Sequence, residues 1–338
     1  MSDPISAAEK SRNDFEYKDV LYTSADVQAI KDIAEPLEEP GRAFCGNMHR
    51  VASLVRVVPR ALWSESVRES LLNQVNLAVF GRIATTREES EDPSRKRDRD
   101  EAMRKLAWEE MRYWQNENDR LMRGVQLLEY VSLQALFKSE IAEGIQSIYQ
   151  AAITGAWTAF EVLIEDLWVA CLNARPRLGF IALDAEPLPD DSEGERERKK
   201  SKRTPVPVWM LRDPAFDPRK QMGDLLKAQR KWDFSRRDRA ADAYKRVFAN
   251  DVDTIQGILE TEDLRWLAAT RNVIVHRASV ADKEFKKLCS RHPYFGKIDD
   301  GSTIVFRGAI VTELVNVAGA KGEELLRFSS DWLKANPT

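Results

Sequence analysis

The sequence predicts an all-α protein built on a helical bundle, with an additional N-terminal helical module and at most a small β-hairpin. Apolar residues recur at the helical period over long stretches, most clearly in 140–174 and 251–278. Strand signals are few, and STIVFRG at 302–308 is either a short strand or the lead-in to a final helix. The length of 338 residues allows two ordinary domains.

The N-terminal part divides into a polar segment and a helical module. Residues 1–40 are polar and acidic, so we expect them to be loosely ordered, with a short helix at 24–35. Pro40-Gly41 marks the boundary of the module, which spans 41–139. Its expected elements are a loop at 41–46, a helix or a strand at 49–58, a helix at 60–82 after Pro59, a charged solvated loop at 86–101, and a helix at 100–138 that pairs with 60–82 as a hairpin.

Residues 140–335 are expected to form a single helical domain. The helix at 140–174 ends before Pro176, because proline cannot continue a helix. Residues 182–207 combine Pro, Gly and Ser with a switch from acidic to basic side chains, so we expect a flexible insertion there. The remaining expected elements are helices at 218–231, 235–249 (with Ser235 as N-cap), 251–278 and 282–289, a turn at 299–301, and a helix at about 307–335.

Charge and hydropathy restrict the class of function. The net charge of -3 argues against a generally basic nucleic-acid binder and leaves a local basic groove open. The most apolar segment, 156–170, contains Glu161, Glu165 and Asp166, so it is expected to be a buried helix and not a membrane span. The N-terminus lacks the apolar region of a signal peptide.

Cysteine usage predicts a reducing compartment. Cys45, Cys171 and Cys289 are odd in number and far apart, without CxxC spacing. This pattern predicts neither a disulfide framework nor a zinc ribbon. We therefore expect three reduced thiols in a cytoplasmic protein.

One segment that is expected to be helical, RNVIVH at 271–276, contains both apolar core residues and polar residues. Asn272 and His276 are four residues apart and share a helix face. Arg271 and His276 lie about 140° apart on the helical wheel, but arginine is long enough to reach that face. Leu267, Val273 and Ile274 can bury the other side. The spacing alone favours a partly buried structural histidine, because arginine is frequent in this chain.

These three residue types suit the cleavage of RNA without a metal. Arginine presents a fork of donors that matches phosphate oxygens, and histidine moves protons near neutral pH. RNA carries its own nucleophile, the 2′-OH. His276 would take that proton, Arg271 would stabilise the pentavalent phosphate, and Asn272 would orient the imidazole or hold a phosphate oxygen. The other histidine of this region, His292, precedes Pro293 and is interpreted as a turn residue.

The sequence around RNVIVH resembles the RiboL-PSP-HEPN-like branch of the HEPN superfamily. RNVIVH is similar to its R-[polar]-x-x-x-H signature, and AWTAFEVLIEDLW at 156–168 looks like its first conserved helix. The segments RKQMGDLLKAQRKWDF, AADAYKRVF and VADKEF, with the final helix, follow in the expected order. The resemblance covers about 140–335, and residues 1–139 resemble no family we can name.

The resemblance implies a helical bundle that acts as a metal-independent endoribonuclease in toxin or anti-phage defence, with no cofactor. It implies a composite active site in a homodimer, RNA as substrate, and an antitoxin or other regulatory protein as a further partner. Carried over, Arg271 stabilises the phosphate, Asn272 is the polar helper, and His276 is the general acid/base. Glu161 either pairs with Arg271 or is a surface carboxylate. Ala278 stands where some branches carry a tyrosine, so a function of that tyrosine does not transfer.

A second hypothesis belongs to a different class of protein. Some members of the superfamily only bind nucleotides or proteins, so the fold does not prove the activity. In that case the chain is a catalytically inactive, HEPN-like adaptor whose working surface is the N-terminal module. An Arg271 held in a salt bridge and a buried His276 would favour this alternative.

Overall fold

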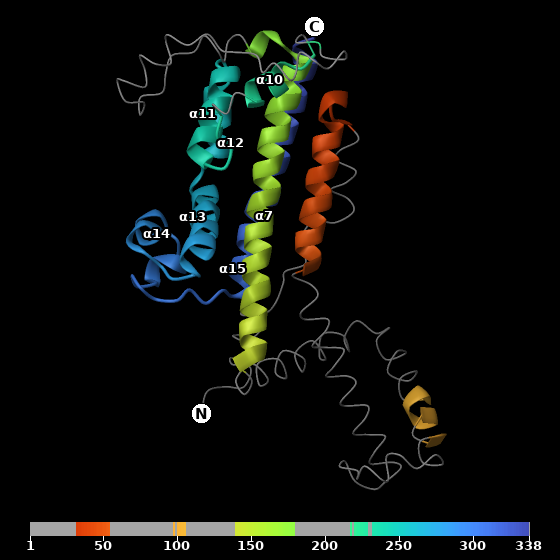
Figure 1. Cartoon of the computed structure of the whole chain (residues 1–338), viewed down its shortest axis with the longest axis vertical. Coiled ribbons are helices and arrows are strands. Elements are labelled where there is room, and N and C mark those ends of the chain that lie inside the picture. Colours follow the sequence, from red (N-terminus) through yellow and green to blue (C-terminus); the bar gives the residue numbers. More distant parts are fainter. Residues whose placement is uncertain are drawn as a thin grey trace. The chain divides into compact units, whose positions relative to one another are not determined.

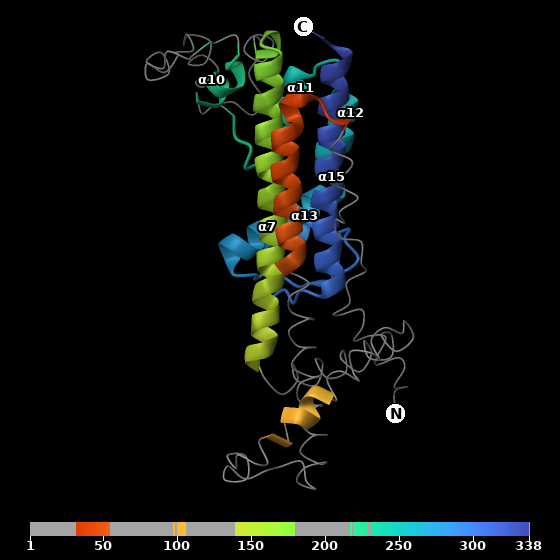
Figure 2. The same ribbon diagram turned by 90° about the vertical axis from the view of Figure 1, so that its right-hand side faces the viewer.

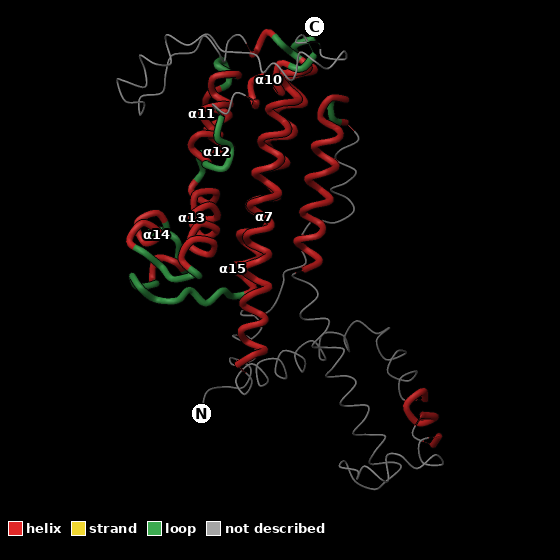
Figure 3. Tube along the Cα trace, viewed as in Figure 1, coloured by secondary structure: helices red, strands yellow, loops and turns green. Residues whose placement is uncertain are grey.

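The computed structural model describes residues 32–54, 97–98, 100–105, 139–179, 217, 220–228 and 232–337. Within these ranges the chain is mostly helical and contains no β-strand, as the secondary-structure colouring of Figure 3 shows. The predicted all-α class is therefore confirmed. The sequence predicts at most a small β-hairpin, and the described residues contain a single antiparallel bridge, between Val280 and Thr303.

Two compact units make up the chain. In the smaller unit, the described residues 97–98, 100–105 and the start of α7 (Ser139–Ala174) are helical. The larger unit contains described residues 32–52 together with most of the C-terminal part of the chain. It holds the rest of α7, the helical residues 38–52, and α10 (Met222–Ala228), α11 (Arg237–Val247), α12 (Val252–Leu259), α13 (Glu262–Arg277), α14 (Lys283–Leu288) and most of α15 (Gly308–Ala335).

Three long helices form the frame of the larger unit. Figures 1 and 2 show residues 38–52, α7 and α15 running alongside one another. Phe44, Met48, Val51 and Ala52 recur at the helical period and are buried. At the far end, the Arg175 guanidinium donates to the carbonyl oxygens of Leu333 (3.0 Å) and Asn336 (2.5 Å), so the last residues of α15 are tied to the end of α7.

Helix α11 packs against α7 through large buried side chains. The Tyr244 hydroxyl donates to the carbonyl of Ile164 at 2.7 Å, and Trp168 Nε1 donates to the carbonyl of Ala243 at 3.3 Å. Phe248, just beyond α11, contacts the ring of Trp332 on α15 edge-on. These contacts fix α11 on the long helices, and α12 and α13 follow it along them (Figure 1).

Several sequence predictions are wrong in their details. Residues 38–54 are one helical stretch, so the loop expected at 41–46 is absent and the described part of 49–58 is helix. The helix expected at 251–278 is two helices, α12 and α13, because the chain becomes extended at Thr261. Ser235 is not the N-cap of α11. Arg236 occupies that position and makes no side-chain cap hydrogen bond.

Other predictions agree with the described residues or lie outside them. Helix α7 ends before Pro176 as expected, and none of the three cysteines, all of which are described, forms a disulfide bond. The polar segment before residue 32, the helix at 60–82, most of the helix at 100–138 and the insertion at 182–207 lie outside the described residues. In the described ranges, no helix combines the length and the apolar character needed to cross a bilayer.

Candidate functional site on helix α13

Helix α13 carries three of the four predicted site residues. It begins after Thr261 with two acidic residues, Glu262 and Asp263, in its first turn, where the helix dipole favours negative charge. It ends at Arg277, and the backbone of Ala278 is left-handed, with φ of 48°. The carbonyl of Val273 accepts from the amide of Ser279 at 3.1 Å, which closes the last turn. His276 therefore lies in a well-defined final turn.

Arg271 and Asn272 are joined directly. Arg271 Nη1 donates a hydrogen bond to Asn272 Oδ1 at 3.1 Å. The contact draws the guanidinium of half-buried Arg271 towards the exposed face that carries Asn272 and His276. A guanidinium has five N–H donors, so most of them stay available after this bond. Its Nε is buried and has no hydrogen-bond partner among the described residues.

His276 is exposed one turn after Asn272. We find no hydrogen bond or ion pair of its imidazole with any described residue. Leu267, Thr270 and Val273 are buried on other faces of the helix, whereas Ile274, expected to be buried with them, is only half-buried. The imidazole is thus presented to solvent beside the amide, where a ligand can reach it.

Glu161 lies on α7 and is half-buried. Burial raises the pKa of its carboxyl, and the positive charge of Arg271 partly offsets this effect. The two side chains are close enough to interact electrostatically, but they do not form an ion pair in the described part of the chain. Glu161 is therefore a neighbour of the cation and leaves the guanidinium open to an anion.

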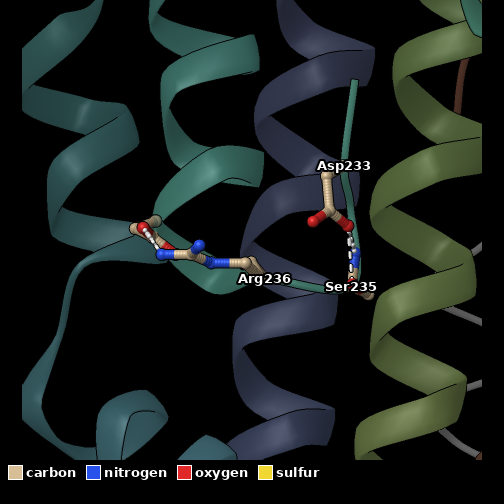
Figure 4. Close-up of polar contacts among 4 residues, drawn as sticks. Asp233, Ser235 and Arg236 are labelled. Atoms are coloured by element: carbon tan, nitrogen blue, oxygen red, sulfur yellow. Dashed lines mark hydrogen bonds and ion pairs between the residues drawn. The ribbon is translucent and has the colours of Figure 1, made fainter. Parts of the chain in front are cut away.

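The segment before α11 brings a second carboxylate into this neighbourhood. The negative charge of Asp233 contributes to the raised pKa of Glu161. Asp233 Oδ1 accepts from the amide and the hydroxyl of Ser235, at 3.0 and 2.6 Å. Figure 4 shows this turn, with the Arg236 side chain extending away from it to bind Asp238 at 2.8 Å. No sequence pattern predicts the position of Asp233, because its approach to α7 depends on the tertiary fold.

His292 lies in a turn, as predicted, where its amide donates to the carbonyl of Cys289 at 3.0 Å, and its side chain is buried. Its Nδ1 accepts from the amides of Tyr294 and Phe295, at 3.1 and 3.2 Å, and its ring meets Trp266 edge-on. Because Nδ1 is an acceptor, the neutral ring carries its proton on Nε2, which lies 3.3 Å from Glu313 Oε1 without hydrogen-bond alignment. This histidine organises the loop after α14.

The geometry thus brings Arg271 and Asn272 into contact, places His276 one turn further along the same face, and leaves Glu161 beside Arg271. Among the described residues, no group of three His, Cys, Asp or Glu side chains is arranged to hold a metal ion. Comparison of the chain with models of protein families, with curated proteins and with solved structures found no significant match.

Proposed function

We propose that this chain is a metal-independent endoribonuclease of HEPN type. The observation that carries the proposal is the hydrogen bond between Arg271 and Asn272, which sets a guanidinium beside the face that presents the exposed His276. A cation that can bind phosphate, a polar side chain and a proton acceptor then lie on one side of one helix. Neither feature expected of an inactive adaptor, a salt-bridged Arg271 or a buried His276, is found in the described residues.

The proposed reaction is transesterification by the 2′-OH of RNA. The 2′ oxygen passes its proton to the His276 imidazole and attacks the adjacent phosphorus. The new P–O2′ bond forms while the P–O5′ bond breaks, and the Arg271 guanidinium stabilises the negative charge of the pentavalent phosphate. The leaving 5′ oxygen takes a proton from the His276 imidazolium of a second copy, which yields 2′,3′-cyclic phosphate and 5′-OH ends.

This proposal includes the cellular setting implied by the resemblance. The enzyme acts in the cytoplasm on RNA, as a homodimer whose two α13 helices form a composite site. It works in toxin or anti-phage defence, and an antitoxin or other regulatory protein restrains it. Glu161 belongs to the site as the carboxylate that adjusts the charge around Arg271.

The test compares wild type with His276→Ala and Arg271→Ala on labelled total RNA in EDTA, with the product ends mapped. We expect wild type to give 2′,3′-cyclic phosphate ends and each variant to lose at least about a hundredfold in rate. His49→Ala is the matched control, because His49 is an exposed histidine of the 38–54 stretch. Cleavage that survives both site variants would overturn the proposal. If several RNA pools stay intact with a confirmed dimer, the adaptor hypothesis replaces it.

A further inference from the structure

Val275 lies on the solvent side of the candidate active site. It is 49% exposed, which makes it one of the few large apolar residues that the described part of the chain presents to solvent. Single exposed valines are common on protein surfaces and need no explanation by themselves. Val275 differs by its position in the last turns of α13. It directly precedes His276 and follows Arg271 and Asn272 by one turn.

Helix geometry places this valine among the polar groups of the site. At about 100° per residue, Val275 falls between Arg271 and His276 on the wheel of α13, about 40° from the first and about 100° from the second. Residues three and four apart on a helix are neighbours, so Val275 adjoins both Asn272 and Arg271. A helical side chain leans towards the preceding turn, where Arg271 Nη1 donates to Asn272 Oδ1. The exposed face therefore carries a cation, an amide and an imidazole around an apolar patch.

A single nucleotide of RNA carries a matching set of groups. In the proposed reaction its 3′ phosphate binds Arg271, and its 2′-OH gives a proton to His276. What remains is the base, whose face is the large apolar surface of a nucleotide and stacks on side chains when proteins bind single strands. Valine has no donor or acceptor in its side chain, so it can contact this face but cannot read the edges of the base. The patch at Val275 fits the base of that same nucleotide.

We propose that Val275 contacts the face of the base on the nucleotide that supplies the 2′-OH, and thereby positions the ribose of that nucleotide between His276 and Arg271. The inference rests on the proposed function, because it concerns the substrate of that reaction. Val275 is a positioning residue and takes no part in proton transfer. The site should therefore require a base at this nucleotide and cleave after any of the four bases at similar rates.

The test removes the valine and the base separately and together. The substrates are an oligoribonucleotide that wild type cleaves at a mapped bond, and the same strand with an abasic ribonucleotide on the 5′ side of that bond. We expect Val275→Thr, which keeps the branched shape, to slow cleavage of the first strand about three- to tenfold and to leave cleavage of the abasic strand unchanged. Val275→Ile should keep the wild-type rates. Val305→Thr is the matched control, because Val305 is 57% exposed in the loop before α15.

The outcomes separate this inference from the proposed function. If Val275→Thr slows both strands equally, the valine acts on the fold or on contact with a second copy, and the base contact is overturned. An unchanged rate of Val275→Thr on the normal strand would also overturn the base contact, while the nuclease stands. If wild type cleaves no RNA, the nuclease is refuted and the base contact is refuted with it.

Discussion

Arg271 Nη1 donates to Asn272 Oδ1 at 3.1 Å, so the cation and the amide of the candidate site are one unit. Neighbouring residues of a helix lie about 100° apart, and a side chain as long as arginine closes that gap. The amide thereby limits the positions open to the guanidinium, and the guanidinium fixes the orientation of the amide. Asn272 is accordingly a positioning residue for Arg271.

Substitution of Asn272 should affect cleavage through Arg271. We expect Asn272→Ala to slow single-turnover cleavage of RNA about tenfold, because the guanidinium loses its anchor. Asn272→Asp keeps an acceptor for Arg271 but adds a negative charge that repels phosphate, so its loss should be larger. Gln256→Ala, an exposed amide of α12, is the control. Full activity of Asn272→Ala would show that this residue does not position Arg271, and full activity of Asn272→Asp would show that it does not meet the phosphate.

Glu161 should make the stability of the protein depend on pH. Burial raises the pKa of this carboxyl above its ordinary value of 4.5, and Arg271 offsets only part of the shift. A carboxyl with a raised folded-state pKa contributes stability below the unfolded value, and that contribution is lost as the pH rises through the folded value. We therefore expect Glu161→Gln to melt at a higher temperature than wild type at pH 7 and at the same temperature near pH 4.

The control for this measurement is Glu143→Gln, which alters an exposed carboxylate near the start of the same helix. Its melting temperature should follow that of wild type at both pH values. If Glu161→Gln melts below wild type at pH 7, the attraction between Glu161 and Arg271 outweighs the cost of burial. The carboxylate would then be a true ion-pair partner of the arginine.

Gly223 should be required for the close approach of α10 to α7. A Cβ atom there would lie 2.3 Å from the carbonyl oxygen of Val169, which is backbone and cannot move aside. The Gly223 amide also donates to Asn173 Oδ1 at 2.8 Å. We expect Gly223→Ala to lower the free energy of unfolding in urea by about 2 kcal/mol. Gly257→Ala, in open space within α12, should raise it by about 0.5 kcal/mol. Equal effects of the two substitutions would contradict this packing.

The long helices could be predicted because local sequence and packing agree there. Helix α7 has an unbroken apolar period and a proline just beyond its end, so its expected bounds of 140–174 are close to Ser139–Ala174. The break between α12 and α13 carries neither glycine nor proline, and the apolar period hardly changes across it. Only the extended backbone of Thr261 separates the two helices.

The glycines of the 38–54 stretch misled the prediction because packing overrides propensity there. Gly41 and Gly46 favour a loop by their local preference. Four apolar residues at helical spacing, from Phe44 to Ala52, are nevertheless buried, and Val51 lies against Gly155 on α7, far away in the sequence. Gly322 on α15 leaves room for the Phe44 ring, which a Cβ atom would approach to 2.2 Å. Such a contact between distant segments has no local signal.

Part of the candidate site could be predicted from the sequence, and part could not. The four-residue spacing of Asn272 and His276 depends on helix geometry alone, so their shared face follows from the sequence. The approach of Asp233 to α7 arises from tertiary packing. The burial of His292 depends on Glu313 and Trp266, which lie on other elements.

The turn after His276 should contain backbone strain that a substitution by glycine removes. Ala278 and Ser279 both have positive φ, 48° and 64°, which costs an L-residue about 1 kcal/mol relative to glycine. Ala278 is exposed, so Ala278→Gly should raise the free energy of unfolding by about 1 kcal/mol without loss of packing. Gly301 gives the matched reverse change: its φ is 81° and its Cβ position is open, so Gly301→Ala should lower the free energy by a similar amount. Both are measured by urea unfolding, and a destabilised Ala278→Gly would contradict the left-handed backbone. Ala278 makes no hydrogen bond or ion pair with a predicted site residue. The stabilised variant should therefore cleave RNA at the wild-type rate, and a changed rate would show that the strained turn positions His276.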